Sequence, residues 1–329
     1  MPTLTSWKTL ASLFLITALP ACAGFEVNDH QGRIEIRDNG KLVFGWQSAP
    51  IKNPRGGPEF AGSAYIHPLC TPSGFKLTDE QPSDHLHHFG VWWPWKFLGT
   101  NGQKFNTWEL QNKQGRHIAV SATVTSKSAD EVILKLVNQS EIKTTAGTAD
   151  TTGTKYQPVI NEQTTLRFAR LGKDAYVLDL TIQQEPVKGK KIEVVKYRYS
   201  GFSWRGTPDF KKANSRMQTS GDHNRDTANG QTARWAMVSG DVPSDPQKGQ
   251  ATILIMSAAP KNGGTPERLR VWNSKAGTDA QFINFNPVVE TTQTMDAAHP
   301  GVASRKYRLI LADRSIKPTE AERLWQLWK

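Results

Sequence analysis

Short runs in which apolar and polar residues alternate recur along most of the chain, and this pattern limits the fold more than any other feature. The alternation is clear in Glu131–Val137 (EVILKLV) and in Ala175–Gln183 (AYVLDLTIQ). A period of two residues is typical of β-strands with one buried face. Hydrophobic residues make up 37% of the chain, which suits such half-buried strands. In Arg33–Trp46, the residues Asp38-Asn39-Gly40 separate two runs and predict a hairpin turn.

The same reading predicts most of the remaining architecture. In His117–Ser126 it places four apolar residues on one face of a strand, namely Ile118, Val120, Ala122 and Val124. A helix is predicted for Lys317–Trp328, with Pro318 near its start. Two stretches without periodicity, Ile51–Gln114 and Thr207–Gln231, are predicted as long loops, which are often functional. We therefore predict an all-β fold: a large antiparallel β-sandwich, with a galactose-mutarotase-like double sheet as one form, and a short C-terminal helix.

The N-terminus has the features of an export signal. The apolar run Leu10–Leu19 is shorter than the ~20 residues that span a bilayer. Residues 1–22 are therefore predicted as a signal peptide, followed by a single domain over residues 25–329. Leu19–Cys22 (LPAC) resembles a lipobox that would lipidate Cys22, whereas Ala21–Ala23 (ACA) suits cleavage to a soluble protein. Either way, we predict an exported protein, periplasmic or attached to the outer membrane as a lipoprotein. Membrane contact would come only through that lipid.

The chain carries a formal net charge of +11. Its positive residues are spread out and form no basic stripe of the kind that nucleic-acid-binding proteins show. We therefore expect no nucleic-acid partner. The charge suits attraction to an anionic substrate such as an acidic carbohydrate.

The stretch Asp84–Trp95 (DHLHHFGVWWPW) holds three of the eight histidines. On an extended chain, His85 and His87 would point to one side and His88 to the other. Imidazole transfers protons near neutral pH, and a carboxylate can fix its tautomer. We predict that one of these histidines is a catalytic acid or base and that Asp84 orients it. Histidines at this spacing also bind metals with an acidic residue, so metal-assisted chemistry is an alternative, although no metal ligand or cofactor is assigned.

Tryptophans follow the histidines at once. Flat apolar rings with polar edges make good stacking surfaces for sugars, so Trp92, Trp93 and Trp95 are predicted to contact substrate. A role in the hydrophobic core fits them equally well. Trp93 and Trp95 are expected to share one face.

Further candidates lie elsewhere in the chain. His67 precedes Pro68 and either closes a pocket or packs internally. Arg198 and Arg205 flank the sequence YSGFSW and are predicted to bind substrate, because arginine grips carboxylates and sulfates through two parallel hydrogen bonds. Surface salt bridges are the alternative for both. Glu162 is a candidate acid or base partner, and Cys70 is interpreted as a small buried residue.

Tyr65–Trp93 (YIHPLCTPSGFKLTDEQPSDHLHHFGVWW) resembles the signature of the DUF6807 family, also labelled PmoA-like. Weaker similarity continues in Tyr197–Arg205, Ala233–Gly240 and Ile283–Pro287. Cys70 departs from the aromatic residue usual at its position. The resemblance implies an exported, mostly β-sandwich protein of polysaccharide-degrading bacteria. The methane-oxygenase label finds no support in the sequence, because a membrane-embedded subunit needs several apolar spans of ~20 residues.

From these features we predict an exported carbohydrate-active enzyme, a glycoside hydrolase or a lyase, that uses histidine acid–base chemistry. Two alternatives stay open. One is a non-catalytic glycan-binding lipoprotein, and the other is a metal-dependent enzyme.

Overall fold

The computed structural model describes residues 24–242, 249–258, 267–296 and 303–329. The predicted signal peptide and Cys22 lie outside these residues. Among the residues described, three antiparallel sheets make up most of the structure. No helix in these parts of the chain is long and apolar enough to cross a membrane. The predicted all-β class is thus confirmed.

The first large sheet has eight strands. In spatial order they are β1 (Phe25–His30), β2 (Arg33–Asp38), β3 (Lys41–Gln47), β4 (Tyr65–Leu69), β5 (Val91–Trp92), β13 (Phe202–Arg205), β18 (Phe282–Asn286) and β17 (Arg268–Val271). The hairpin predicted at Asp38-Asn39-Gly40 joins β2 to β3. Asn39 and Gly40 both have positive φ, 50° and 76°, as a type I′ turn requires.

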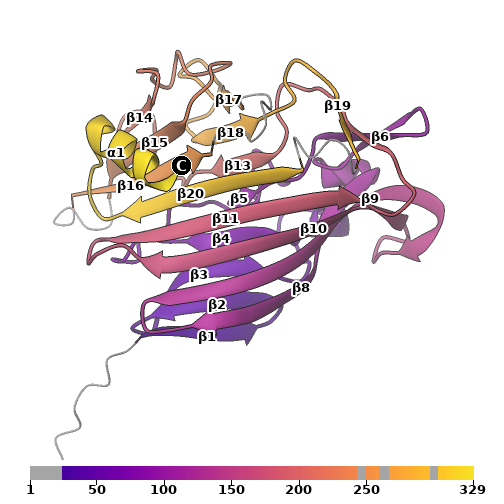
Figure 1. The fold of residues 1–329 in the computed structure, drawn as a ribbon, viewed down its shortest axis with the longest axis horizontal. Coiled ribbons are helices and arrows are strands. Elements are labelled where there is room, and N and C mark those ends of the chain that lie inside the picture. Colours follow the sequence, from indigo (N-terminus) through magenta and orange to yellow (C-terminus); the bar gives the residue numbers. More distant parts are fainter. Residues whose placement is uncertain (1–23, 243–248, 259–266, 297–302) are drawn as a thin grey trace, which may run out of the picture.

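The second large sheet also has eight strands and lies in front of β1–β4 in Figure 1. In spatial order they are β14 (Ser215–Thr219), β15 (Trp235–Asp241), β16 (Gln250–Ser257), β20 (Ser304–Ala312), β11 (Ala175–Pro186), β10 (Lys155–Arg170), β9 (Glu131–Ala149) and β8 (Gly115–Lys127). A small third sheet contains β19 (Gln293–Met295), β12 (Ile192–Val194), β6 (Phe97–Thr100) and β7 (Gln103–Asn106).

The main core fills the space between the two large sheets. Phe44, Trp46 and Ile66 enter it from the first sheet. Leu134 and Phe168 enter it from the second. The predicted β-sandwich is therefore confirmed, because side chains of both sheets form one buried cluster.

The predicted C-terminal helix is confirmed as α1 (Pro318–Trp328). It covers part of the outer face of the second sheet, where Ala321 and Trp325 pack against Trp235 and Met237 of β15. The Trp325 indole also donates a hydrogen bond of 3.0 Å to the carbonyl of Ser257. Burial of the apolar face of α1, and not the helix propensity of its residues, accounts for the docking of α1 on the second sheet.

Two expectations need correction. The four apolar residues predicted on one face of His117–Ser126 do not share one environment, because Val120 and Val124 are 53% and 41% exposed on the edge strand β8, whereas Ala122 packs against the main core. Two register shifts in the β8–β9 pairing interrupt the regular alternation of this strand. The predicted loops are also not structureless. Ile51–Gln114 contains β4–β7 and two short helices, η1 (Pro58–Phe60) and η2 (Leu110–Asn112), and Thr207–Gln231 contains β14.

Candidate functional site

The alternation of side chains along the strands of the first sheet brings one group of aromatic residues together on its outer face, away from the second sheet. In β5, Val91 points into the main core and Trp92 points outward. In β18, Ile283 points inward and Phe282 outward. The resulting outer aromatic cluster consists of Tyr65, Phe89, Trp92, Trp108 and Phe282, with Tyr199 and Trp272 packed at its margin.

The histidine segment folds over this cluster as a series of turns between β4 and β5. The His85 amide donates to the Pro82 carbonyl, and the His88 amide donates to the His85 carbonyl, both at 3.0 Å. The expected extended chain was therefore wrong at this point. Because the segment turns, all three imidazoles meet: the ring of His88 stacks on that of His85 at 4.6 Å and contacts that of His87 at 5.0 Å between ring centroids.

Two of the three histidines are held neutral near pH 7. Burial lowers the pKa of His88 well below its usual value, and its ring lies 5.0 Å from Trp92 and 5.2 Å from Phe282. Burial also lowers the pKa of His87, to about 4, against the opposing effect of the Glu109 carboxylate. Neither ring is suited to carry a proton at neutral pH.

His85 has a different environment. Its side chain is 37% exposed, and its Nδ1 lies 3.3 Å from the carboxylate of Asp84. Arg205 Nη2 donates to both oxygens of Asp84, at 2.7 and 2.9 Å. Burial raises the pKa of Asp84, but the neighbouring His85 ring and the Arg205 guanidinium outweigh it and hold that pKa well below its usual value. Asp84 is thus ionised and lies close enough to the His85 ring to orient it.

The ring of Trp272 completes this arrangement. It lies 4.8 Å from the His85 ring and 5.0 Å from the Arg205 guanidinium. It is partly exposed and follows directly after β17. An aromatic surface, an exposed imidazole and an ionised carboxylate therefore lie side by side.

Several buried nitrogen atoms around the outer aromatic cluster have no hydrogen-bond partner within the described protein. They are Trp92 Nε1, Trp108 Nε1, His85 Nδ1, His88 Nδ1, Arg205 Nε and Arg205 Nη1. An unpaired buried polar group costs ~1–3 kcal/mol. Such a concentration at one place is a common mark of a functional site.

The structure separates the remaining predicted site residues from this group. Trp93 and Trp95 are fully buried and share the inner side, as expected. The Trp93 indole donates to Glu162 at 2.8 Å and the Trp95 indole to Gln184 at 2.9 Å, both on the second sheet. Their rings offer no exposed surface to a sugar, and the Trp92 ring, within the outer aromatic cluster, is only 3% exposed, so we do not retain the substrate-contact prediction for any of the three.

His67 and Arg198 lie at opposite extremes of exposure. His67 is buried, its Nδ1 is 2.9 Å from the Thr78 hydroxyl, and burial lowers its pKa to about 3. This environment fits internal packing. Arg198 is exposed, with its guanidinium 5.7 Å from the Tyr199 ring at the margin of the outer aromatic cluster.

Residues that the sequence did not single out contribute as much as the predicted ones. Trp272 and Phe282 contact His88 from segments much further along the chain. Asp79 lies close to Arg205 and Asp84, and burial raises the pKa of its carboxyl. Asp79 and Asp84 therefore have carboxyl pKa values shifted in opposite directions, a pattern that suits acid–base work. No local sequence signal identifies Trp272 or Phe282.

Among the described residues, no group of three or more His, Cys, Asp or Glu side chains is arranged to hold a metal ion.

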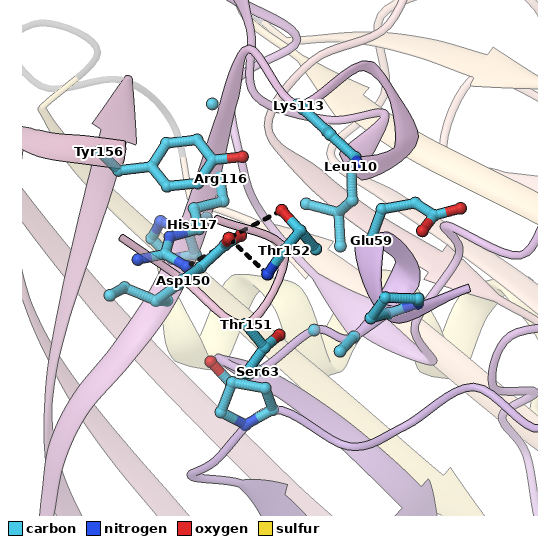
Figure 2. A pocket seen from close by; sticks show the side chains of 16 residues that line it. Glu59, Ser63, Leu110, Lys113, Arg116, His117, Asp150, Thr151, Thr152 and Tyr156 are labelled. Atoms are coloured by element: carbon cyan, nitrogen blue, oxygen red, sulfur yellow. Dashed lines mark hydrogen bonds and ion pairs between the residues drawn. The ribbon is translucent and has the colours of Figure 1, made fainter. Parts of the chain in front are cut away.

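A separate cavity of about 190 Å³ lies between η1, η2 and the hairpin that joins β9 to β10. Figure 2 shows Tyr156, Arg116 and Asp150 on one side of it and Leu110, Lys113 and Glu59 on the other. Its polar groups largely satisfy one another: Arg116 Nε donates to Glu141 at 2.6 Å, and Asp150 accepts from Thr152. The histidine segment has more unpaired buried nitrogens, so we place the candidate site there.

Comparison with known proteins gives a family and two distant structural likenesses. The model of a "Family of unknown function (DUF6807)" matches residues 33–326, and no curated protein matches the chain. A 4-alpha-glucanotransferase from Thermococcus litoralis is 7% identical, with a TM-score of 0.35 over 88% of this chain. A GalM/aldose epimerase homologue from C. elegans has the same identity, TM-score and coverage of this chain. The chain spans 39% of the length of the first and 98% of the second.

Proposed function

The chain belongs to the DUF6807 family, and we propose that a carbohydrate binds against Trp272, at the margin of the outer aromatic cluster, beside the histidine segment, where His85 transfers a proton. One observation carries this proposal: the exposed His85 ring is held between the ionised Asp84 carboxylate and the Trp272 ring. A carboxylate and an aromatic ring placed in this way orient the acid–base group, His85, beside a surface on which a sugar ring can stack.

Carbohydrate is the ligand class that fits this combination best. Sugar rings have one apolar face that can lie on Trp272, and hydroxyl groups that can pair with the polar groups around it. The partly exposed side chains of His85 and Asp84 supply hydrogen-bonding groups beside Trp272. A purely apolar ligand would cover such groups without pairing them, at ~1–3 kcal/mol each.

The proposed chemistry is glycoside cleavage by hydrolysis or by elimination. His85 would accept a proton from water in the first case and from a sugar carbon in the second. Asp84 keeps the His85 imidazole oriented and stabilises its protonated form. Asp79, with its raised pKa, is a candidate to protonate the departing oxygen. His87 and His88 would act by contact, because burial keeps them neutral.

A mass-spectrometric product screen tests this proposal. The wild-type protein and the His85→Ala variant would be incubated with neutral, acidic and sulfated glycosides. His30→Ala serves as the matched control, because His30 is exposed on β1 and remote from the site. We expect a product with the wild type and the control, and a rate lower by ~10²–10⁴-fold for His85→Ala. A loss of less than about threefold would refute the role of His85. Tight glycan binding without any product would favour the binding-module alternative.

Export is part of the same proposal. It depends on the pattern of residues 1–22, with Cys22 as the residue that would carry a lipid. Intact-mass analysis of the protein from its native membranes or periplasm would test it. A lipid mass on Cys22 or cleavage next to Ala23 would support export, whereas an intact residue 1–22 segment in the cytoplasm would contradict it.

A further inference from the structure

Two arginines at the edge of the candidate site, Arg198 and Arg270, have no carboxylate partner among the described residues. Arg270 lies on the outer side of β17, two residues before Trp272, whereas Leu269 and Val271 point into the main core. Residues i and i+2 of a strand project to the same side. The Arg270 side chain is therefore directed to the side of the sheet on which Trp272 lies. Its Nη1 donates to Asn229 Oδ1 at 3.0 Å, and it forms no ion pair with any described residue.

Arg198 connects to the site through a row of aromatic rings. Its guanidinium lies 5.7 Å from the ring of Tyr199. Tyr199 lies 5.1 Å from Trp108, Trp108 lies 5.4 Å from Trp92, and Trp92 lies 5.0 Å from His88, all between ring centroids. Arg198 likewise forms no ion pair within the described chain.

These two guanidiniums act on each other electrostatically. Burial lowers the pKa of Arg270, and the positive charge of Arg198 lowers it further. The nearby carboxylate of Glu109 does not offset them, because it is bound to Lys96 at 2.7 Å and to the Tyr199 hydroxyl at 3.1 Å. Within the described part of the chain, these two interacting positive groups thus have no carboxylate as a counter-charge.

Several other half-buried arginines are neutralised by carboxylates, whereas Arg225 donates instead to the backbone carbonyls of Trp272 and Ala280. Arg116 is paired with Glu141, Arg170 with Asp38 and Arg314 with Glu320. Like charges without a counter-ion destabilise a fold, so an unpaired arginine pair beside a candidate site needs a reason. An anion supplied by a ligand provides one.

We infer that the carbohydrate bound at the histidine segment carries a carboxylate or sulfate group, which Arg198 and Arg270 hold while the sugar ring lies against Trp272. This inference rests on the proposed function and narrows its substrate class to acidic carbohydrates. Arginine suits both groups, because its planar fork matches two oxygens of a carboxylate or a sulfate. Arg205 is less available, since its Nη2 is already bound to Asp84.

Glycan-array binding by the full-length protein tests this inference. The array would carry neutral, uronic-acid and sulfated oligosaccharides, probed with the wild type, Arg270→Gln and Arg198→Gln. Arg216→Gln is the matched control, because Arg216 is exposed on β14 and forms no ion pair with the described residues. A charge-assisted hydrogen bond contributes ~1.5–3 kcal/mol, so we expect roughly ten- to hundredfold weaker binding of acidic glycans for each site variant. The control should bind as the wild type does.

The outcomes separate the two proposals. Binding confined to uronic acids or to sulfated sugars identifies the anionic group and supports the inference. Binding of neutral glycans with equal affinity, unchanged in Arg270→Gln and Arg198→Gln, overturns the inference and leaves the proposed function intact. Binding of no glycan on the array contradicts both.

Discussion

Replacing Glu162 by glutamine should destabilise the fold, although the two side chains have nearly the same shape. The Glu162 carboxylate is fully buried, and its Oε1 accepts hydrogen bonds from Trp93 Nε1, Asn138 Nδ2 and Thr164 Oγ1 at 2.7–2.9 Å. Its Oε2 accepts from Gln184 Nε2 at 2.5 Å. Burial raises the pKa of Glu162, but the His117 charge and these hydrogen bonds outweigh it and lower that pKa. The Glu162 carboxylate therefore links the second sheet to Trp93, the residue that follows Trp92 in the chain.

In Glu162→Gln, the new amide NH₂ takes the place of Oε2 and faces the NH₂ of Gln184. Gln184 cannot simply turn over, because its Oε1 already accepts from Trp95 Nε1 at 2.9 Å. One charge-assisted bond is lost, at ~1.5–3 kcal/mol, and a buried donor is left unpaired. We expect the free energy of unfolding to fall by about 2–4 kcal/mol, measured by urea denaturation with linear extrapolation.

The double variant Glu162→Gln, Gln184→Glu is the matched control. The amide at position 162 would then donate to the carboxylate at position 184, which would still accept from Trp95. Most of the lost stability should return, to within about 1 kcal/mol of the wild type. A single variant within ~0.5 kcal/mol of the wild type, or a double variant no more stable than the single, would refute this reasoning.

Three further predictions follow from other residues. Burial holds the pKa of His67 at about 3, below its unfolded value of ~6.5, so the stability that neutral His67 confers is complete above pH ~6.5 and is lost as the pH falls toward 3. In urea unfolding between pH 7 and 4, the free energy of unfolding should fall with pH by about 1.4 kcal/mol per pH unit less in His67→Gln than in the wild type. Parallel curves of the free energy of unfolding against pH would contradict this. Burial raises the pKa of the Cys70 thiol to about 12, so iodoacetamide at pH 8 should label Cys70 only after unfolding; labelling of the native protein would show the thiol to be accessible. Trp272→Ala should weaken sugar binding roughly tenfold, ~1.4 kcal/mol, in calorimetry, whereas Trp328→Ala on α1 should leave it unchanged; equal losses would argue against stacking on Trp272.

The fold could be predicted from the sequence where local chemistry decides the structure. Alternation predicted the strands at Glu131–Val137 and Ala175–Gln183, and Asn39-Gly40 predicted a turn that needs positive φ at both positions. Alternation misled at Val120 and Val124, because an edge strand with register shifts has no second layer over its outer face. The period of the alternation shows which residues share a face of a strand, but it does not show which face is covered by a second layer of the protein.

The candidate site could be predicted only in part. The three histidines of the segment and Asp84 lie together in the sequence, so their grouping could be predicted. Trp92 and Trp93 could not be sorted into site and core, because the first sheet carries aromatic residues on both faces. Trp272 follows β17 and Phe282 belongs to β18, and these strands reach the site only through the order of strands in the sheet. Long-range pairing of this kind leaves no local pattern.

Carbohydrate binding at the histidine segment can be observed by nuclear magnetic resonance of protein with isotope-labelled histidine. The chain has only eight histidines, so single substitutions can assign each imidazole signal. Titration with the glycan selected by the array should shift the signals of His85, His87 and His88. The signals of His30 and His223, which lie elsewhere, should stay in place. We expect saturable shifts confined to the three clustered histidines. Unchanged signals at all three, in the presence of a bound glycan, would show that the site lies elsewhere.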